Sequence, residues 1–391
     1  MSSFGKIVQL PPTGGPRPRS GIASKFAVAT LGLLLASPAG AAVSGCPAAP
    51  TRSTMGTKLA IAIEMHVENP VIGTEEETDY VLELSSAARS AGIVVTFGLG
   101  TDLIDDYAND RDGDGHGIDS RTGLPLTRTL AEVVSAIRAD CQDVGLHADV
   151  PESYAANDIE TMLRGYIRTL RSAGARPVVA SGACNETAAG TSGGWVEAAR
   201  RAGLRAVAGV VTYCQGSLDP SNSRWIDPSS CSPSFPTRCH FAAPEDDAVQ
   251  RVGVWRTNAT SSWIDPAARG RLAVIGGLGS IGGFSESNLP CLAEVDAGRS
   301  CSGYSTAFDA DLDAASLVDR IRSAESDART GTVGDTAYQT FSTNVRASST
   351  YVAAIFPRLI ARLAATTSAS GAPLSDVTSF VSLRTVEGLN R

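Results

Sequence analysis

The stretch that decides the fold is residues 58–68, which read KLAIAIEMHVE. Side chains alternate between the two faces of a strand, so Glu64, His66 and Glu68 share one face, and two small alanines precede them there. Small residues suit the crowded interior of a parallel barrel, and functional residues of such barrels gather at the carboxyl ends of the strands. The segment therefore predicts a buried first strand that ends in polar side chains.

Strand and helix patterns alternate along the rest of the chain. Strands are expected at 58–68, 93–97, 143–150, 177–183, 205–213, 272–275, 338–343 and 377–383, and helices at 74–91, 130–137, 159–170, 195–202, 314–328 and 351–365. Thr74 and Glu77 have the spacing of a capping box at the start of one helix, and Gly92 should end it. This alternation predicts an α/β fold, a distorted (β/α)7-8 barrel.

The barrel should form a single domain over residues 58–391, because no linker rich in Pro, Gly or Ser separates two halves. Residues 43–57 are expected to form a linker. Residues 214–270 are rich in Ser, Pro and Cys, and they predict a long disulfide-rich insertion.

The first 42 residues resemble a secretory signal peptide. Positive charges precede an apolar run from Phe26 to Ala36, and Ala39-Gly40-Ala41 fits a cleavage site. The alternative is a buried helix at the N-terminus. Cys46 follows a sequence that resembles a lipobox, so a lipid anchor at Cys46 is a second possibility. No later stretch is apolar enough to predict a transmembrane segment. We expect a secreted, periplasmic or cell-envelope protein.

Cysteine content and charge agree with this compartment. The chain has eight cysteines, at positions 46, 141, 184, 214, 231, 239, 291 and 301, and no CxxC pair. Disulfides form in oxidising compartments, so we expect stapled loops rather than a zinc ribbon. The net charge of −8 is a poor match for nucleic acid, so no nucleic-acid partner is expected.

Two of the four histidines end expected parallel strands. His66 lies beside Glu64 and Glu68 in sequence, and His147 shares a strand face with Asp149. Imidazoles and carboxylates that meet at one barrel mouth are typical ligands of zinc or another divalent metal. The alternative is a buried His–Glu hydrogen-bond network without a metal.

The segment from Lys58 to about Tyr213 resembles the polysaccharide deacetylase-like (NodB-type) glycoside hydrolase/deacetylase superfamily. The resemblance rests on residues 62–66, AIEMH; 91–97, AGIVVTF; 143–148, DVGLHA; and 200–207, RRAGLRAV. It implies a distorted barrel and a metal held by an acid of the first strand and the histidines of an H-x-x-x-H motif. A neighbouring acid would be the base.

The chain departs from this pattern at several positions. His147 matches the first histidine of the motif, but Pro151 occupies the second position. Residues 181–185, SGACN, replace the usual third motif, and residues 342–344, STN, replace a histidine of the final strand. We expect Glu64, His66 and His147 to hold the metal, and Glu68 or Asp149 to be the base that takes a proton from water. Asp149 could instead orient a histidine.

Three further motifs have weaker specificity. Asp110, Asp112 and Asp114 match the start of a calcium loop, to which Asp119 could contribute; the alternative is a solvated acidic loop. Residues 277–282 match GxGxxG, but no helix pattern follows to hold a dinucleotide, so a glycine-rich loop is expected. Residues 190–194 match GxSxG without a tight strand–turn elbow, and only His240 follows as a base for a serine esterase.

Together these patterns predict a secreted, metal-dependent carbohydrate deacetylase-like hydrolase that removes acetyl groups from a polysaccharide or other glycan. The alternative is a catalytically degenerate barrel that acts as a carbohydrate-binding or structural protein of the cell envelope.

Overall fold

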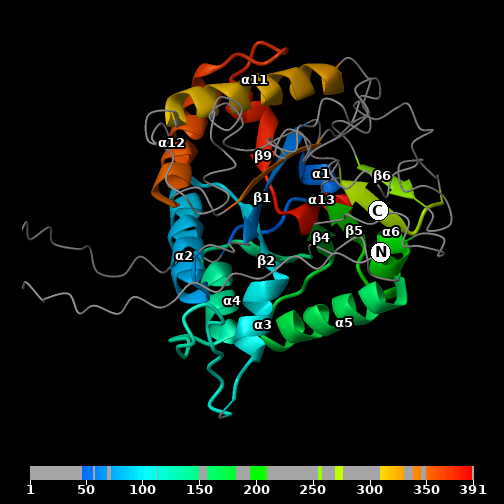
Figure 1. Cartoon of the computed structure of the whole chain (residues 1–391). Helices are drawn as coiled ribbons and strands as arrows, with labels where there is room; N and C mark the ends of the chain where they lie inside the picture. Colours follow the sequence, from blue (N-terminus) through cyan, green and yellow to red (C-terminus); the bar gives the residue numbers. More distant parts are fainter. Residues whose placement is uncertain are drawn as a thin grey trace, which may run out of the picture. The chain divides into compact units, whose positions relative to one another are not determined.

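The central feature of the structure is a parallel sheet that begins with β1 (Leu59–Val67) and curls into a distorted (β/α) barrel (Figure 1). The computed structural model describes residues 46–55, 58–67, 72–111, 113–148, 156–181, 194–208, 254–257, 269–275, 309–329, 338–344 and 349–389. Residues from Cys46 to Arg391 form one unit by their internal contacts. The predicted signal peptide lies outside the described residues.

The sheet has nine strands, eight of them in the order β6-β7-β5-β4-β3-β2-β1-β8, with β9 paired to β1. The other strands are β2 (Val95–Gly100), β3 (Asp143–His147), β4 (Val179–Ser181), β5 (Ala206–Ala208), β6 (Val254–Thr257), β7 (Leu272–Ile275), β8 (Tyr338–Asn344) and β9 (Thr378–Phe380). All described pairs are parallel except β6 with β7. The predicted α/β barrel is therefore confirmed.

Most helices pack on the outside of the sheet. The helices are α1 (Arg52–Met55), α2 (Thr74–Ala91), α3 (Thr101–Ala108), α4 (Leu130–Ala139), α5 (Ala156–Ser172), α6 (Gly194–Arg201), α11 (Ala310–Arg329), α12 (Ser349–Ala365), the short 3-10 helix η4 (Leu374–Val377) and α13 (Leu383–Leu389). Of these, α1 and α13 contribute to the core on the inner side of the sheet. Neighbours around the sheet are α11 with α12, α12 with α2, α2 with α4, α3 with α5, and α5 with α6 (Figure 1).

Alternation along β1 creates two cores. Outward-facing residues such as Ile61, Ile63 and Met65 join the helices in the larger core. Inward-facing Ala60 and Ala62 belong to a smaller core that also contains Leu383, Val386 and Leu389 of α13. Because the inward residues at this level are small, the barrel interior has room for the apolar side of a helix.

Several local expectations were wrong. The capping box at Thr74 does not form: Gly73 is the N-cap of α2, and Thr74 Oγ1 donates to Asp106 Oδ2 at 2.6 Å. The box forms instead at α4, between Thr129 and Glu132, where the hydrogen bonds from Thr129 lower the pKa of Glu132. Gly92 ends α2 with φ of 73°, as expected.

The C-terminal strand is shorter than predicted. Only Thr378–Phe380 is strand, and Leu383 begins α13 instead of ending the strand. The sequence pattern also missed α3 and the strand β6, which lies inside the expected insertion. Most of that insertion, with its cysteines, lies outside the described residues.

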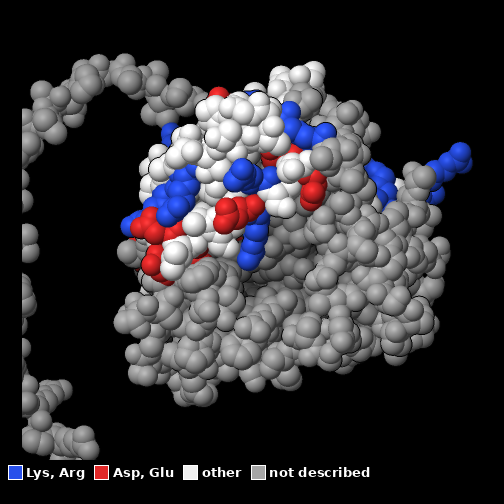
Figure 2. Space-filling model, turned by 90° about the horizontal axis from the view of Figure 1, so that it is seen from above, with Lys and Arg blue, Asp and Glu red and all other residues white. Residues whose placement is uncertain are grey.

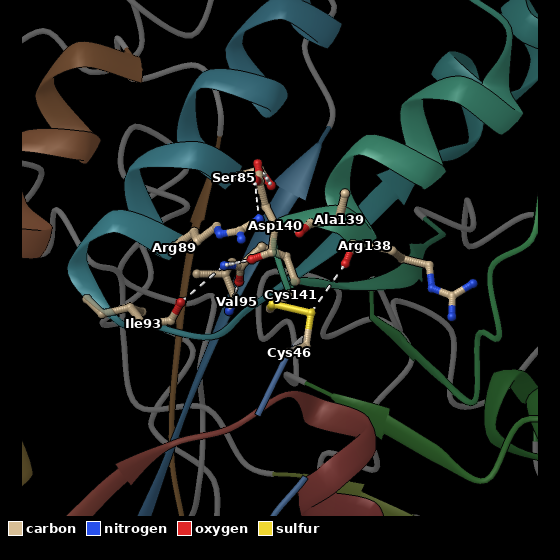
Figure 3. Close-up of a disulfide and its surroundings, with 10 residues drawn as sticks. Cys46, Ser85, Arg89, Ile93, Val95, Arg138, Ala139, Asp140 and Cys141 are labelled. Carbon is tan, nitrogen blue, oxygen red and sulfur yellow. Dashed lines mark hydrogen bonds and ion pairs between the residues drawn. A yellow bond between two sulfur atoms is a disulfide. The ribbon is translucent and has the colours of Figure 1, made fainter. Parts of the chain in front are cut away.

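A disulfide joins Cys46 to Cys141, which lies between α4 and β3 (Figure 3). The next residue, Gln142, is buried and accepts a hydrogen bond from Val95 N at 2.6 Å while donating to the carbonyls of Ile93 and Asp140. Because a sulfur in a disulfide cannot carry a lipid thioether, the structure does not support the lipid anchor at Cys46. Within the described residues, no helix has the length and apolar character needed to cross a bilayer.

Candidate functional site at the carboxyl mouth of the barrel

The inward faces of three strands, β1, β3 and β4, end in polar side chains. Glu64 and His66 come from β1, His147 from β3 and Ser181 from β4. Their residues are 2%, 8%, 3% and 1% exposed, respectively, so all four are removed from bulk water. The sequence pattern correctly predicted that Glu64 and His66 share the inward face and meet His147.

Strand register explains why these side chains meet. Glu64 pairs with Thr96 and His66 with Gly98 across β1 and β2. Across β2 and β3, Gly98 pairs with Gly145 and Gly100 with His147, so His147 shares the inward face with His66 but lies one strand period nearer the carboxyl end. Residues in register on neighbouring strands lie at the same height, and their side chains alternate in and out together.

Gly98 makes room for the cluster. A Cβ atom at this position would lie 3.1 Å from Glu64 Oε1 and 3.3 Å from His147 Cβ. A larger residue here would push the carboxylate and the imidazole out of place. Sequence reasoning missed this role, although the glycines at alternate positions 98 and 100 were a visible signal.

The two imidazoles lie face to face. The ring centroids of His66 and His147 are 4.0 Å apart, with an interplanar angle of 23°. His66 Nε2 lies 3.5 Å from Glu64 Oε2. This nitrogen is buried and makes no hydrogen bond within the described part of the chain. A buried polar atom without a hydrogen bond costs about 1–3 kcal/mol, so its persistence needs an explanation.

Ser181 fixes the orientation of His147. Its Oγ lies 2.7 Å from His147 Nδ1, and the backbone of Ala148 donates to Ser181 O at 3.0 Å. If Nδ1 is the donor, Nε2 carries the lone pair and becomes the ligand atom. Ser181 was part of the altered third motif but was not among the predicted site residues.

The donor types suit a divalent metal, because zinc in catalytic sites takes imidazole and carboxylate ligands. The buried His66 Nε2 is also suited to be a metal ligand. The arrangement of the two imidazoles is less suited to a metal ion, because stacked rings do not direct their nitrogens to one point. Across the described ranges, no three His, Cys, Asp or Glu side chains are arranged to hold a metal ion.

Several other predicted site residues are not described by the structure. Glu68 and Asp149, the two candidate bases, lie outside the described residues, as do His240, the GxGxxG loop and the serine of GxSxG. Their roles stay predictions.

The expected calcium loop is organised by backbone hydrogen bonds. Asp110 accepts from Gly113 N at 2.7 Å and Gly115 N at 2.9 Å, and Asp114 accepts from His116 N at 2.7 Å. Asp119 Oδ1 accepts from the backbones of two following residues. Asp112 lies outside the described residues. These bonds show how the acids shape the loop, and calcium binding stays a prediction.

The chain was compared with known proteins. No protein-family model and no curated protein sequence matches it. A probable polysaccharide deacetylase from Pseudomonas aeruginosa PAO1 aligns with a TM-score of 0.44 and 12% identity, over 85% of this chain and 90% of that chain. Puue allantoinase aligns with a TM-score of 0.43 and 11% identity, over 86% and 92% of the two chains. A 4-alpha-glucanotransferase from Thermococcus litoralis aligns with a TM-score of 0.42 and 8% identity, over 84% and 40%. Likeness at this level does not decide the chemistry of the mouth.

Proposed function

We propose that the protein is a metal-dependent hydrolase that removes acetyl groups from a glycan at the carboxyl mouth of its barrel. The observation that carries the proposal is the buried His66 Nε2, which makes no hydrogen bond with any described residue and lies 3.5 Å from Glu64 Oε2. A nitrogen held dry beside a carboxylate and a second imidazole is suited to receive a cation.

Glu64, His66 and His147 would hold the ion, which we propose to be zinc or another divalent metal. When bound, such an ion lowers the pKa of water to about 7 and polarises a carbonyl oxygen. Ser181 would hold the His147 ring through Nδ1, and Gly98 would keep the space between strands open. The glycan as substrate rests on the resemblance of residues 58–213 to the deacetylase superfamily.

The proton of the attacking water would pass to Glu68 or Asp149. Each follows a proposed ligand by one strand period in the sequence, Glu68 after His66 and Asp149 after His147. Side chains two residues apart on a strand share a face, which would bring either carboxylate to the mouth. Asp149 could alternatively orient His147.

Secretion is part of the same proposal. The disulfide at Cys46 supports it, because disulfides persist in oxidising compartments and this one lies just after the predicted cleavage site. Residues 1–42 would be removed on export.

A second candidate function is favoured by the stacked rings. If the two imidazoles keep that arrangement, the barrel binds no metal and acts as a carbohydrate-binding or structural protein of the cell envelope. Pro151 in place of the second motif histidine points the same way.

Metal content and acetate release distinguish the two functions. The purified protein should contain about one zinc-like ion per chain and release acetate from acetylated xylan or N-acetylglucosamine oligomers. His147→Ala and Glu64→Gln should lose both, with acetate release falling at least about 100-fold. Glu68→Gln or Asp149→Asn, whichever is the base, should keep the metal and lose activity.

His116→Ala is the matched control, because His116 contacts the carbonyl of Leu126 and lies apart from the mouth cluster. It should keep metal and activity. A wild-type protein that takes up no divalent metal and releases no acetate would refute the hydrolase and favour the binding protein.

A further inference from the structure

A basic pocket lies between the second half of α5 and the end of α6. It measures about 370 Å³ and is lined by Arg164, Ile167, Arg168, Arg171, Ser172 and Ala202. Its size falls in the range of ordinary ligand pockets. None of its residues belongs to the proposed hydrolytic site.

The spacing of the arginines places them on one stripe. Positions 164, 168 and 171 are separated by four and three residues, so at about 100° per residue they fall within about 60° of the helix circumference. Cβ atoms at such spacings are about 5–6 Å apart. The pocket therefore presents a row of three guanidinium groups along about 10 Å of helix.

One end of the row is held by the protein. Arg164 Nε donates to Glu160 Oε1 at 2.9 Å, and Arg164 also donates to the carbonyl of Arg201. Arg168 and Arg171 are exposed, and the guanidinium group of neither forms an ion pair or hydrogen bond with another described residue. Within the described part of the chain, two of the three cations therefore have no anionic partner.

The region around this row of arginines is positively charged, although the chain as a whole is acidic. Residues 156–181 and 194–208 contain seven arginines and three acids, a local charge of 7 − 3 = +4, whereas the whole chain has a net charge of −8. Residues 161–185 contain no Asp or Glu. By contrast, on the face seen from above, positive and negative side chains alternate (Figure 2).

The helix itself does not require this arrangement. Like charges three or four residues apart destabilise a helix by about 0.2–0.5 kcal/mol per pair. A cation in the last turn, such as Arg171, is favoured by the helix dipole, but Arg164 lies at the middle of α5. An anion bound across the row would relieve the repulsion.

We propose that this pocket binds the carboxylates of an acidic glycan, and so anchors the protein on a polymer while the mouth acts on acetyl groups. Planar guanidinium groups match carboxylates in bidentate geometry, and a regular row matches charges that repeat along an extended chain. Ile167 and Ala202 provide the apolar floor against which a sugar ring can pack. The choice of a glycan over another polyanion rests on the proposed function.

The test is binding of the full-length secreted protein to polygalacturonate, measured by affinity electrophoresis or calorimetry. Fully methyl-esterified polygalacturonate has the same backbone without the charge and is the control ligand. Wild type should bind the acidic polymer, should not bind the esterified one, and should bind more weakly as NaCl rises from about 0.05 to about 0.5 M. Arg168→Glu with Arg171→Glu should weaken binding at least about 10-fold.

Arg111→Glu with Arg322→Glu makes the same change in net charge at exposed sites on other elements, and it should bind like wild type. Arg168→Gln with Arg171→Gln covers the case in which the acidic pair fails to fold. Equal losses in the control pair, or equal binding of the esterified polymer, would overturn the site. Tighter binding of polyphosphate or a DNA oligonucleotide would overturn the acidic glycan as its ligand.

The result is separable from the hydrolase. The α5 variants should still release acetate from short neutral oligomers, and His147→Ala should still bind polygalacturonate. Loss of acetate release alone would count against the proposed function, and loss of polymer binding alone would count against the pocket.

Discussion

The two ends of the barrel interior are built from the same sheet, but they differ in whether their buried polar groups have hydrogen-bond or ion-pair partners. Towards the amino end, at the starts of β2 and β3, Thr96 Oγ1 accepts from Leu383 N at 3.0 Å, and Asp143 pairs with Arg384 at 2.8 Å; Thr96 lies in register with Glu64, directly below the mouth. At the carboxyl end, His66 Nε2 is buried without a hydrogen bond.

The difference separates stability from function. At the amino end, α13 inserts Leu383 among the small inward residues and supplies partners for the polar ones. At that end, the polar groups therefore find their partners within the protein. At the mouth, the described residues bring together a carboxylate and two imidazoles and give His66 Nε2 no hydrogen bond; in the proposed function a metal ion would occupy that position. In barrels of this kind, function belongs to the carboxyl ends of the strands and stability to the opposite end.

The largest expected effect is at the mouth, from Gly98→Val. The new side chain would enter the space between Glu64 Oε1 and His147 Cβ, which are 3.1 Å and 3.3 Å from the position of a Cβ. Acetate release should fall at least about 100-fold, because small displacements of reacting groups have effects of that size. The free energy of unfolding should fall by about 1–3 kcal/mol.

Gly165→Val is the matched control. Gly165 lies on α5, and a Cβ there meets no heavy atom within 4 Å. This variant should keep full activity. If Gly98→Val were as active as wild type and Gly165→Val, a larger side chain would fit beside Glu64 and His147, and the description of the mouth as tightly packed would be wrong.

The next effect concerns the disulfide between Cys46 and Cys141, two residues before the start of the Asp143 network. Replacing both cysteines with serine frees a loop with a sequence separation of 95 residues, and the free energy of unfolding should fall by about 2–5 kcal/mol. Denaturant unfolding with and without reductant measures it.

Metal content and acetate release at low temperature should not change, because the disulfide lies away from the mouth. A stable variant with lost activity would contradict the separation of the two ends. Any effect of reductant on the serine variant measures the other six cysteines, so the comparison of the two proteins without reductant isolates this disulfide.

A third, smaller effect is expected for Arg384→Met. Removing the guanidinium leaves the Asp143 carboxylate buried without its ion pair. Arg384 is 42% exposed at its side chain, so solvent screens part of the loss, and about 1–2 kcal/mol is expected. Thermal unfolding measures it, and Arg322→Met, an exposed arginine of α11, is the control. Equal melting temperatures for Arg384→Met and Arg322→Met would mean that the ion pair between Asp143 and Arg384 does not contribute to stability.

The sequence predicted the mouth better than the amino end for physical reasons. His66 and Glu64 stand out because polar residues are rare inside a strand, and the period of two places them together. The interactions of Thr96 and Asp143 could not be predicted from the sequence, because their partners come from α13, which for Thr96 is a separation of 287 residues. The predicted strand 377–383 included only the first residue of α13, Leu383, and the rest of this seven-residue helix was not predicted because three apolar residues in so short a segment show no clear period.

The stacking of His66 on His147 could not be foreseen for a related reason. Strand register predicts which side chains share a level, but not how two rings share the space above a glycine. That depends on Gly98 and on the hydrogen bond between Ser181 Oγ and His147 Nδ1, which fix the His147 ring from two sides. The capping box failed at Thr74 because Asp106, from a helix that was not predicted, took its hydroxyl.

The last and smallest effect is a pH dependence at the amino end. Burial raises the pKa of Asp143 above its ordinary value of 3.8, and the nearby Arg384 guanidinium lowers it only in part. A raised pKa means that the folded state binds the proton more tightly than the unfolded state. Stability from this group is therefore present below pH 3.8 and is lost as the pH rises through the folded pKa.

Asp143→Asn should remove this contribution, so the difference in unfolding free energy between wild type and variant should change in that pH window and be flat near neutral pH. Asp376→Asn, at an exposed acid, controls for the loss of one negative charge. A difference that runs in the opposite direction, with wild type gaining stability relative to Asp143→Asn as the pH rises, would show that Arg384 outweighs burial and that the amino end is held by its ion pair.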